Sequence, residues 1–368
     1  MENYIYYYLE EDNLLVFSKT SGRLYGFDNF ASSAFSFLKE GLGTKDELLQ
    51  AVEGNSDAQD VICTISNLLN GQEEPEVNES SEDDLVLEYP LATLPKNYKN
   101  PFYYKLDTFI FVIDTENELI IEKILPAIAH MKCEKCADEK VSVDINLIEK
   151  NSKWSVLLNG TVIQENLEPT QVLPRIQDYI RISYYRSTDY LISLHSGALY
   201  FNKIPLIMPA SSGSGKSTLS TYLMHQKGFE FLTDEVVMID KRSHIWPIPL
   251  AITIKEGSWK VLESYGISLD HLSVHERFDG QSLRFLPPVQ IATESLALNG
   301  GYLIFPKYSE GATTELKPLN TLEALNIITT SGYEVFDSYD EATIELWVKT
   351  LENLNKYTIT YSNLKDAR

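Results

Sequence analysis

The sequence predicts an α/β protein in which an acidic linker joins a small N-terminal module to a larger domain of strands and helices. Three observations support this fold class. Residues 204–226 have the pattern of a strand, a glycine-rich loop and a helix in succession. Residues 73–88 hold eight carboxylates and no basic residue, which is typical of a linker. Residues 13–69 carry short strand and helix patterns, and a chain of 368 residues has room for two or three domains.

The N-terminal module is expected over residues 1–72. Residues 13–18 and 23–27 are predicted strands of a hairpin around a turn at 19–22. Apolar residues at helical spacing then predict helices over 29–40, 44–51 and 57–69. Thr44 and Glu47 form a capping box at the start of the second helix. Two strands with three helices predict a winged-helix-like module.

The acidic linker is expected over residues 73–97. The chain has no lysine or arginine between Lys45 and Lys96. Carboxylates at this density repel one another and few apolar residues are present to order them, so we expect a flexible tether. An acidic bait for a basic peptide remains an alternative.

Strands dominate the next region, residues 98–190. The predicted strands lie at 108–113, 141–147, 154–158 and 162–163, and the Asn159-Gly160 pair between the last two is a strong hairpin signal. An amphipathic helix follows at 173–190, with Pro174 in its first turn. Strands at 190–200 and 204–208 then lead into the glycine-rich loop.

Residues 210–218 read Ala-Ser-Ser-Gly-Ser-Gly-Lys-Ser-Thr and fit the phosphate-binding loop G-x-x-x-x-G-K-[ST], with Ala210 in place of the first glycine. Glycines allow successive N–H groups to converge on phosphate oxygens, the lysine reaches the β- and γ-phosphates, and the serine hydroxyl can bind Mg²⁺. A glycine- and serine-rich surface loop is the alternative, but it would not require the strand–loop–helix context. The expected nucleotide-binding residues are Ala210, Ser211, Ser212, Gly213, Ser214, Gly215, Lys216, Ser217 and Thr218.

A phosphoryl-transfer site also needs carboxylates for a metal ion and a proton acceptor. The predicted strand 229–233 ends in Asp234-Glu235. If this strand lies beside the loop strand, it delivers both carboxylates to the edge of the sheet where phosphates bind; an acidic hairpin turn is the alternative. Ser217, Asp234 and Glu235 are therefore the expected metal ligands.

Other basic side chains are weaker candidates for the same site. His195 lies one predicted hairpin upstream of the loop, where it would support the γ-phosphoryl group or orient a carboxylate, although a lone histidine in an apolar strand is usually a packed core residue. Lys255 and Glu256 are candidates for a further charge pair near the metal, and Arg284 and Lys307 for neutralising the transferring phosphoryl group, but each is also typical of a solvated surface charge. The expected catalytic set is Asp234, His195, Lys216 and Glu235.

Charge and cysteine usage restrict the partners and the compartment. A formal net charge of −22 repels nucleic acid and anionic membranes and favours a basic or neutral polypeptide, although solubility alone would also explain it. The N-terminus does not resemble a signal peptide, and no apolar run has the length of a membrane span, so a cytoplasmic protein is expected. The three cysteines, Cys63, Cys133 and Cys136, fit a reducing compartment; His130 with the last two lacks the second ligand pair of a structural zinc site.

Together these residues resemble the HPr kinase family and its relatives of unassigned substrate. The resemblance covers about residues 98–367, and the specific matches lie between His195 and Glu235. They are His195-Ser196-Gly197, the hairpin into residues 210–218, Gly228-Phe229 and Asp234-Glu235, with further similarity at 247–255, 305–308 and 361–364.

The resemblance implies a phosphoenolpyruvate-carboxykinase-like domain around a mixed sheet over residues 191–368. It also implies ATP and Mg²⁺ as cofactors and transfer of phosphate to a serine-type hydroxyl. Asp234 matches the family's first paired aspartate, which is proposed to receive the hydroxyl proton near the metal, and His195 matches the family's strand histidine. Glu235 matches the second aspartate but is longer by one methylene, which leaves open how the two carboxylates divide base and metal roles.

The N-terminal module is similar to the PqqD-like modules that recognise leader peptides in peptide-maturation systems. The matching residues lie at 14–17, 21–28, 31–41 and 44–48. The similarity implies that the module binds an extended peptide as an added strand at a sheet edge. The alternative is a structural wing packed on the kinase domain.

The first functional hypothesis is an ATP- and Mg²⁺-dependent kinase that phosphorylates a Ser or Thr hydroxyl of a peptide or protein, such as a leader-containing precursor peptide held by the N-terminal module. The second is a kinase for a metabolite hydroxyl, with a purely structural wing. A nucleotide-gated binding protein is disfavoured because it needs no proton acceptor such as Asp234. The sequence leaves open the acceptor, the choice among ATP, GTP and pyrophosphate, a reverse activity and the oligomeric state, and an oligomer is compatible with it.

Overall fold

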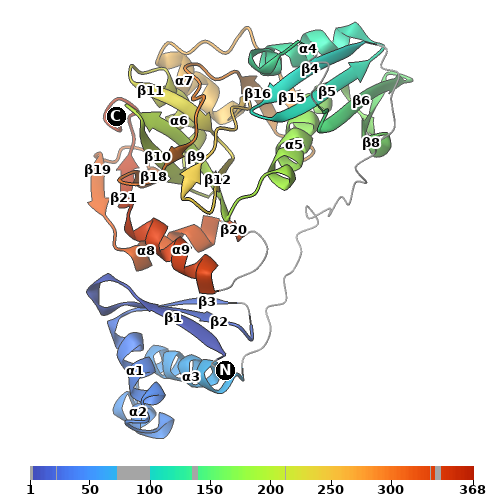
Figure 1. Cartoon of the computed structure of the whole chain (residues 1–368). Helices are drawn as coiled ribbons and strands as arrows, with labels where there is room; N and C mark the ends of the chain where they lie inside the picture. Colours follow the sequence, from blue (N-terminus) through green and yellow to red (C-terminus); the bar gives the residue numbers. More distant parts are fainter. Residues whose placement is uncertain are drawn as a thin grey trace.

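A computed structural model describes residues 3–21, 23–72, 100–134, 140–211, 213–331, 333–335 and 341–368. Figure 1 shows a small N-terminal unit below a central sheet, with a second large sheet beside the central one. The two larger sheets contain both parallel and antiparallel pairs, so the predicted α/β class is confirmed. The predicted linker, residues 73–97, lies outside the described residues.

The N-terminal unit is a three-stranded antiparallel sheet with three helices on one face. Its elements are β1 (Tyr4–Tyr8), β2 (Leu14–Ser18), β3 (Leu24–Phe27), α1 (Asn29–Lys39), α2 (Lys45–Ala51) and α3 (Ser56–Asn70), with a 3₁₀ turn at Glu10–Asp12. The β2–β3 hairpin, the three helices and the capping box of α2 match the sequence expectation, although Gly22 of the predicted turn lies outside the described residues. Strand β1 was not expected. Its run of tyrosines lacks the polar alternation of a half-exposed strand, because both faces of this sheet are covered.

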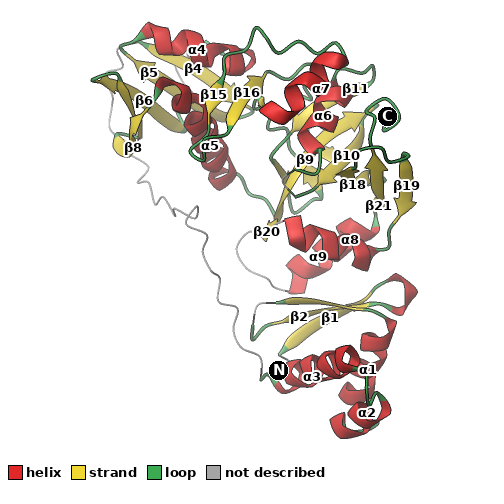
Figure 2. Ribbon diagram, turned by 180° about the vertical axis from the view of Figure 1, so that it is seen from behind, coloured by secondary structure: helices red, strands yellow, loops and turns green. Residues whose placement is uncertain are grey.

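The second face of this small sheet packs on the C-terminal helices α8 (Thr321–Ser331) and α9 (Glu341–Glu352). Figure 2 shows the two helices lying between the small sheet and the central one. Gly26 is in close contact with α8, since a Cβ there would lie 2.2 Å from Leu322 Cδ1. The N-terminal unit is therefore docked on the larger domain through an apolar interface.

Two carboxylates from the N-terminal unit meet the N-terminus of α8. Glu10 accepts a hydrogen bond from the backbone N–H of Thr321 at 2.5 Å, and Glu11 accepts one from the Asn320 side chain at 2.8 Å. Burial raises the pKa of Glu10, but the hydrogen bonds from Thr321 outweigh burial and the net pKa is lowered. An ionised carboxylate at a helix N-terminus is favourable because the first N–H groups carry partial positive charge.

A five-stranded sheet forms the second large layer, with strand order β4-β5-β6-β7-β8. Its elements are β4 (Pro101–Leu106), β5 (Phe109–Thr115), α4 (Glu118–Ile128), β6 (Val143–Lys150), β7 (Lys153–Leu158), β8 (Thr161–Leu167) and α5 (Pro169–Ser187). The β7–β8 turn holds Asn159 and Gly160 at φ of 49° and 85°, which confirms the predicted hairpin. Strand β8 forms one edge of the sheet.

Two helices of this layer differ from the sequence expectation. Helix α4, which crosses between the parallel strands β5 and β6, was not predicted; Pro126 interrupts its pattern. Helix α5 begins at Pro169 and not at residue 173. Its first turn therefore holds Pro169, and Pro174 lies inside the helix. Both helices pack on the sheet through one apolar core, which outweighs the hydrogen bond that an internal proline removes.

The central sheet has ten strands arranged around β9 (Ile192–Phe201). The path order is β17-β13-β12-β9-β10-β18-β21-β19, and β11 and β20 also pair with β9. The strands are β10 (Ile204–Pro209), β11 (Phe229–Thr233), β12 (Val236–Ile239), β13 (His244–Ile245), β17 (Leu296–Ala297), β18 (Tyr302–Tyr308), β19 (Glu315–Pro318), β20 (Tyr333–Val335) and β21 (Asn355–Tyr361). None of the helices in the described ranges has both the length and the apolar character of a membrane span.

Helix α6 (Lys216–Met224) and a small three-stranded sheet cover the central sheet near the glycine-rich loop. The small sheet consists of β14 (Ile252–Lys255), β16 (Ser282–Leu286) and β15 (His275–Glu276), and α7 (Trp259–Ser264) follows β14. Apolar side chains of α6, β11, β14 and α7 form one core. This packing fixes the helix that follows the loop against both sheets.

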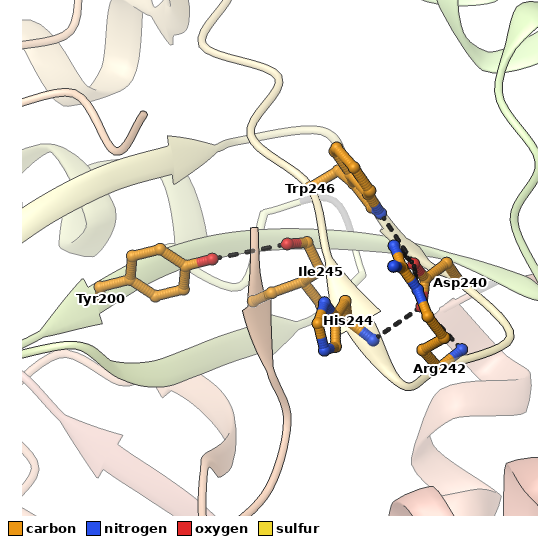
Figure 3. Close-up of polar contacts among 6 residues, drawn as sticks. All are labelled: Tyr200, Asp240, Arg242, His244, Ile245 and Trp246. Atoms are coloured by element: carbon orange, nitrogen blue, oxygen red, sulfur yellow. Dashed lines mark hydrogen bonds and ion pairs between the residues drawn. The ribbon is translucent and has the colours of Figure 1, made fainter. Parts of the chain in front are cut away.

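A buried carboxylate organises the turn between β12 and β13. Asp240 accepts hydrogen bonds from the Arg242 guanidinium at 2.9 Å, from the His244 backbone N–H at 3.0 Å and from Trp246 Nε1 at 3.2 Å (Figure 3). Burial alone would raise the pKa of Asp240, but these hydrogen bonds outweigh it and lower the pKa. The Tyr200 hydroxyl donates to the Ile245 carbonyl at 3.5 Å and holds the same turn to β9.

We expect Asp240→Asn to destabilise the protein at neutral pH by about 1–3 kcal/mol, because an amide cannot accept the same charge-assisted hydrogen bonds. A lowered carboxyl pKa contributes stability above its usual value of about 3.9, and this stability is lost as the pH falls through the lower folded value. Urea unfolding at pH 7 and pH 3 measures the difference. Equal stability of wild type and variant at pH 7 would contradict the role given to Asp240.

Candidate functional site

The glycine-rich loop joins the end of β10 to α6, as the sequence predicts. Gly213 and Gly215 have φ of +90° and +94°, a region in which other residues are strained. A Cβ on Gly215 would lie 2.5 Å from the Tyr361 hydroxyl, which donates to the Gly215 carbonyl at 3.2 Å. The Tyr308 backbone N–H donates to the Ser214 carbonyl at 2.9 Å. Strands β18 and β21 thus hold the loop from outside; Ser212 lies outside the described residues.

The loop presents the N-terminus of α6. Gly215 occupies the N-cap position, and no described side chain caps this end of the helix. Its first N–H groups are therefore available to an anion, and the helix dipole adds partial positive charge there. Ser217 and Thr218 follow in the first turn, and the Thr218 hydroxyl lies 2.7 Å from that of Ser258.

Lys216 and Asp234 are both buried at this point, with exposed fractions of 7% and 4%. Neither carboxylate oxygen of Asp234 has a hydrogen-bond partner among the described residues. A Cβ added to Gly197 on β9 would lie 2.9 Å from the Ser220 hydroxyl and 3.5 Å from both Asp234 Oδ1 and Lys216 Cγ. The missing side chain at Gly197 therefore lets α6 and the carboxylate pack directly against β9.

His195 and Glu235 extend the cluster of Lys216 and Asp234 towards solvent. His195 Nε2 lies 3.4 Å from Lys216 Nζ, and its Nδ1 lies 4.0 Å from Glu235 Oε2. His195 on β9 pairs with Val236 on β12, so the strand register places the imidazole next to the carboxylates. The structure thus brings together all four residues of the expected catalytic set.

The expected position of strand 229–233 beside the loop strand is wrong. Strand β9 lies between β10 and β11 and is antiparallel to both. Strands β10 and β11 therefore run in the same direction, and Asp234-Glu235 still reaches the edge at which the loop lies. The Ser196 backbone N–H holds the Glu235 carbonyl at 3.1 Å, between the β9–β11 and β9–β12 pairings.

The charges of the site differ from those of the same groups in water. Burial raises the pKa of Asp234 to about 7. The positive charge of Lys216 opposes this rise, and the negative charge of Glu235 adds to it. The nearby Ser217 hydroxyl also lowers the pKa of Asp234, although its position does not meet the geometry of a hydrogen bond. Burial would also raise the pKa of Glu235, but Arg181 and Lys216 outweigh burial and the pKa is lowered. Burial and Lys216 lower the pKa of His195. At neutral pH, Glu235 is therefore ionised and His195 is neutral, and Asp234 binds a proton more readily than an exposed aspartate does.

His195, Lys216 and Glu235 line a cavity of about 290 Å³, close to the lower limit for small-ligand sites, whereas Asp234 is not among its lining residues. The sequence identified most of its wall, including Lys255 as a weaker candidate. The lining residues are His195, Ser211, Gly213, Ser214, Gly215, Lys216, Ser217, Thr218, Glu235, Thr253, Ile254, Lys255, Ser258 and Arg277. A larger cavity of about 580 Å³ lies beside Asp240 and Trp246, but no phosphate-binding loop lines it, so volume alone does not identify the site.

Two weaker basic candidates do not line the cavity, and one basic residue of its wall was missed. Arg284 is stacked on Trp259, with 4.4 Å between the guanidinium carbon and the ring centre, and pairs with Asp270 at 3.3 Å. Lys307 is exposed on β18. Arg277 does line the cavity, but no sequence motif marks it, since only the turn between β15 and β16 brings it there.

The residues fit a magnesium ion better than a structural metal. The described ranges contain no cluster of three or more His, Cys, Asp or Glu residues that could hold a metal alone. Mg²⁺ commonly uses only one or two carboxylates together with substrate phosphates, and the two unpartnered oxygens of Asp234 fit this role. His130 instead contacts the Pro249 carbonyl at 2.6 Å, the Cys133 backbone N–H donates to the Tyr103 carbonyl at 3.0 Å, and Cys136 lies outside the described residues.

Comparison with known proteins adds no assignment, since no family model matches this chain and no curated protein is similar to it. The HPr-kinase-like and PqqD-like similarities therefore stay predictions. Function has to be inferred from the geometry and charge of this cavity.

Asp234→Asn is expected to stabilise the nucleotide-free protein at pH 8 by roughly 2–4 kcal/mol, because one pKa unit corresponds to about 1.4 kcal/mol. A raised carboxyl pKa costs nothing below the unfolded value of about 3.9, and the cost grows until the pH reaches about 7. Urea unfolding without nucleotide at pH 4 and pH 8 tests this. A variant that is less stable than wild type at pH 8 would show that Asp234 is not an unfavourably buried charge.

Proposed function

We propose that this protein is a kinase that uses ATP and Mg²⁺ to phosphorylate a Ser or Thr hydroxyl of a peptide or protein. The observation that carries the proposal is the convergence of a buried lysine and an unpartnered buried carboxylate beside the free N-terminus of α6. A site that only binds nucleotide needs the loop and the lysine. It does not need a carboxyl group whose pKa lies near neutrality.

Nucleotide binding follows from the loop. The N–H groups at the start of α6 would donate hydrogen bonds to phosphate oxygens, and Lys216 supplies a buried positive charge to the β- and γ-phosphates. Ser217, Asp234 and Glu235 would hold Mg²⁺, which neutralises charge on the phosphates. Lys255 and Arg277 from other walls of the cavity add positive charge around the transferring group.

In the transfer step, the acceptor hydroxyl oxygen forms a bond to the γ-phosphorus. The bond from that phosphorus to the bridging oxygen breaks, and the nucleoside diphosphate leaves. The hydroxyl proton passes to the Asp234 carboxylate, whose two unpartnered oxygens allow it to accept a proton beside the metal. Glu235 stays ionised for the metal, and neutral His195 lies between Lys216 and Glu235 and fixes their positions.

The structure of the N-terminal unit is relevant to the class of acceptor. Within the described residues, no further strand pairs with β1 or β3, and the edge of a sheet is where an extended peptide can add as a strand. This observation favours a PqqD-like role in holding a substrate polypeptide, such as a leader-containing precursor. The docking of the same sheet on α8 and α9 favours the alternative, a small-molecule kinase with a structural wing.

Lys216→Ala should reduce phosphate transfer by about 10²-fold or more, because a buried charge at the phosphates is lost. Lys317→Ala on the outer strand β19, where the side chain is exposed and pairs with Glu315, is the matched control. ATP consumption is measured at saturating Mg²⁺, and a thermal melt checks folding. A folded Lys216→Ala variant with wild-type turnover would remove the nucleotide assignment.

Mass spectrometry identifies the acceptor class. The protein is incubated with ATP and Mg²⁺ and with a small peptide encoded next to its own reading frame, and a mass gain of one phosphate on a Ser or Thr is expected. Omission of Mg²⁺ is the control. Phosphate found only on a metabolite hydroxyl, with the peptide unchanged, would support the small-molecule kinase instead.

A further inference from the structure

A second cavity, of about 220 Å³, adjoins the phosphate-binding cavity. We call it the acceptor cavity, and it lies between strand β8, the first half of α5 and the turn after β15. Arg277 lines both cavities and marks their junction. The residues that line the acceptor cavity and carry the argument below are Glu165, Arg175, Asp178, Glu276, Arg277 and Phe278.

The mouth of the acceptor cavity displays an aromatic ring. Phe278 is 61% exposed, an unusual state for a large apolar side chain. The guanidinium carbons of Arg175 and Arg277 lie 5.1 and 5.9 Å from its ring centre, within the range of cation–π contacts. The ring is thus held in place at the surface and offers an apolar contact to an incoming side chain.

Strand β8 gives the acceptor cavity a polypeptide-binding edge. It is the last strand of its sheet, no described strand pairs with its outer side, and its residues 164–167 line the cavity. Its pairing with β7 is irregular on both sides of Gln164, and Asn166 has a φ of +63°. This part of the edge therefore offers single N–H and C=O groups to a bound chain and not a regular ladder.

Charge determines the kind of polypeptide. Asp178 pairs with Arg181 at 2.8 Å, and the Arg277 guanidinium pairs with Asp279. Glu165 and Glu276 remain exposed at the cavity; Glu276 accepts a single long hydrogen bond, at 3.5 Å, from Gln171. Three acidic residues (Glu165, Asp178 and Glu276) and two basic ones (Arg175 and Arg277) line the cavity, an excess of one carboxylate to which the net charge of −22 adds. A basic residue next to the acceptor hydroxyl would complement it.

We propose that the acceptor cavity binds the hydroxyl-bearing segment of the substrate polypeptide, extended along β8, with a Lys or Arg near the acceptor facing Glu165 and Glu276. The hydroxyl enters the phosphate-binding cavity at Arg277. The proposal rests on the kinase function proposed above. In both views β8 lies far from the N-terminal unit (Figures 1 and 2), so a substrate held by that unit would be modified on a separate stretch of its chain.

The test uses the full-length protein, ATP, Mg²⁺ and a positional library of serine-containing peptides in which each flanking position is fixed in turn. Wild type should prefer Lys or Arg at one flanking position. Glu165→Lys combined with Glu276→Lys should shift the ratio of kcat/KM for basic against acidic peptides by about tenfold or more towards acidic peptides. Phe278→Ala should lower kcat/KM by about three- to tenfold.

Matched controls lie on the opposite side of the molecule, on β19. Glu315→Gln and Leu316→Ala remove an exposed carboxylate and an exposed apolar side chain there, and both should leave peptide preference unchanged. Thermal melts confirm folding, and the single variants Glu165→Gln and Glu276→Gln replace the double variant if it unfolds; each should weaken the basic preference.

Three outcomes would overturn the proposal and separate it from the kinase function. A basic preference that is unchanged in folded Glu165 and Glu276 variants would place the acceptor elsewhere. Magnesium-dependent ATP consumption without phosphorylation of any peptide would retain the kinase and exclude this polypeptide site. Absence of magnesium-dependent nucleotide binding would overturn the kinase function itself.

Discussion

The candidate site depends on a steric constraint at Gly197, in the middle of the central strand β9. Lys216, Ser220 and Asp234 all approach the position that a side chain would occupy there. Because Gly197 has no side chain, the first turns of α6 and the Asp234-Glu235 segment lie directly against the strand. The buried lysine and the buried carboxylate are therefore neighbours, although the chain reaches them along different elements.

This packing holds Asp234 in an unfavourable environment. Its oxygens have no hydrogen-bond partner in the described part of the chain, and an unpaired buried carboxylate costs several kcal/mol unless it takes up a proton or a cation. The surrounding structure supplies the compensation. Strand β9 is paired along both of its edges, and β18 and β21 brace the loop through Tyr308 and Tyr361. A buried group with an unfavourable free energy of this kind is common at sites that bind a metal or move a proton.

The layers around the central sheet place further groups at this cavity. Helix α5 brings Arg181 near enough to lower the pKa of Glu235, and the β15–β16 turn of the small three-stranded sheet brings Arg277 into the cavity wall. Helices α8 and α9 join the central sheet to the N-terminal unit. Glu10 accepts a hydrogen bond at the N-terminus of α8, so the interface between the N-terminal unit and α8 is polar as well as apolar. The N-terminal unit is thus an integral part of the packed structure in the described residues.

The sequence by itself determined the local elements and the chemistry of the loop. Residues 210–218 specify a turn by their glycines and a charge by Lys216, and the strand predicted at 229–233 has the boundaries of β11. These features depend on residues close together in the chain. Only the tertiary structure decided that β9 separates β10 from β11, that Arg277 reaches the cavity while Arg284 stacks on Trp259, and that β1 and α4 form at all. Each of these outcomes is set by packing between segments far apart in the sequence, which no local pattern records.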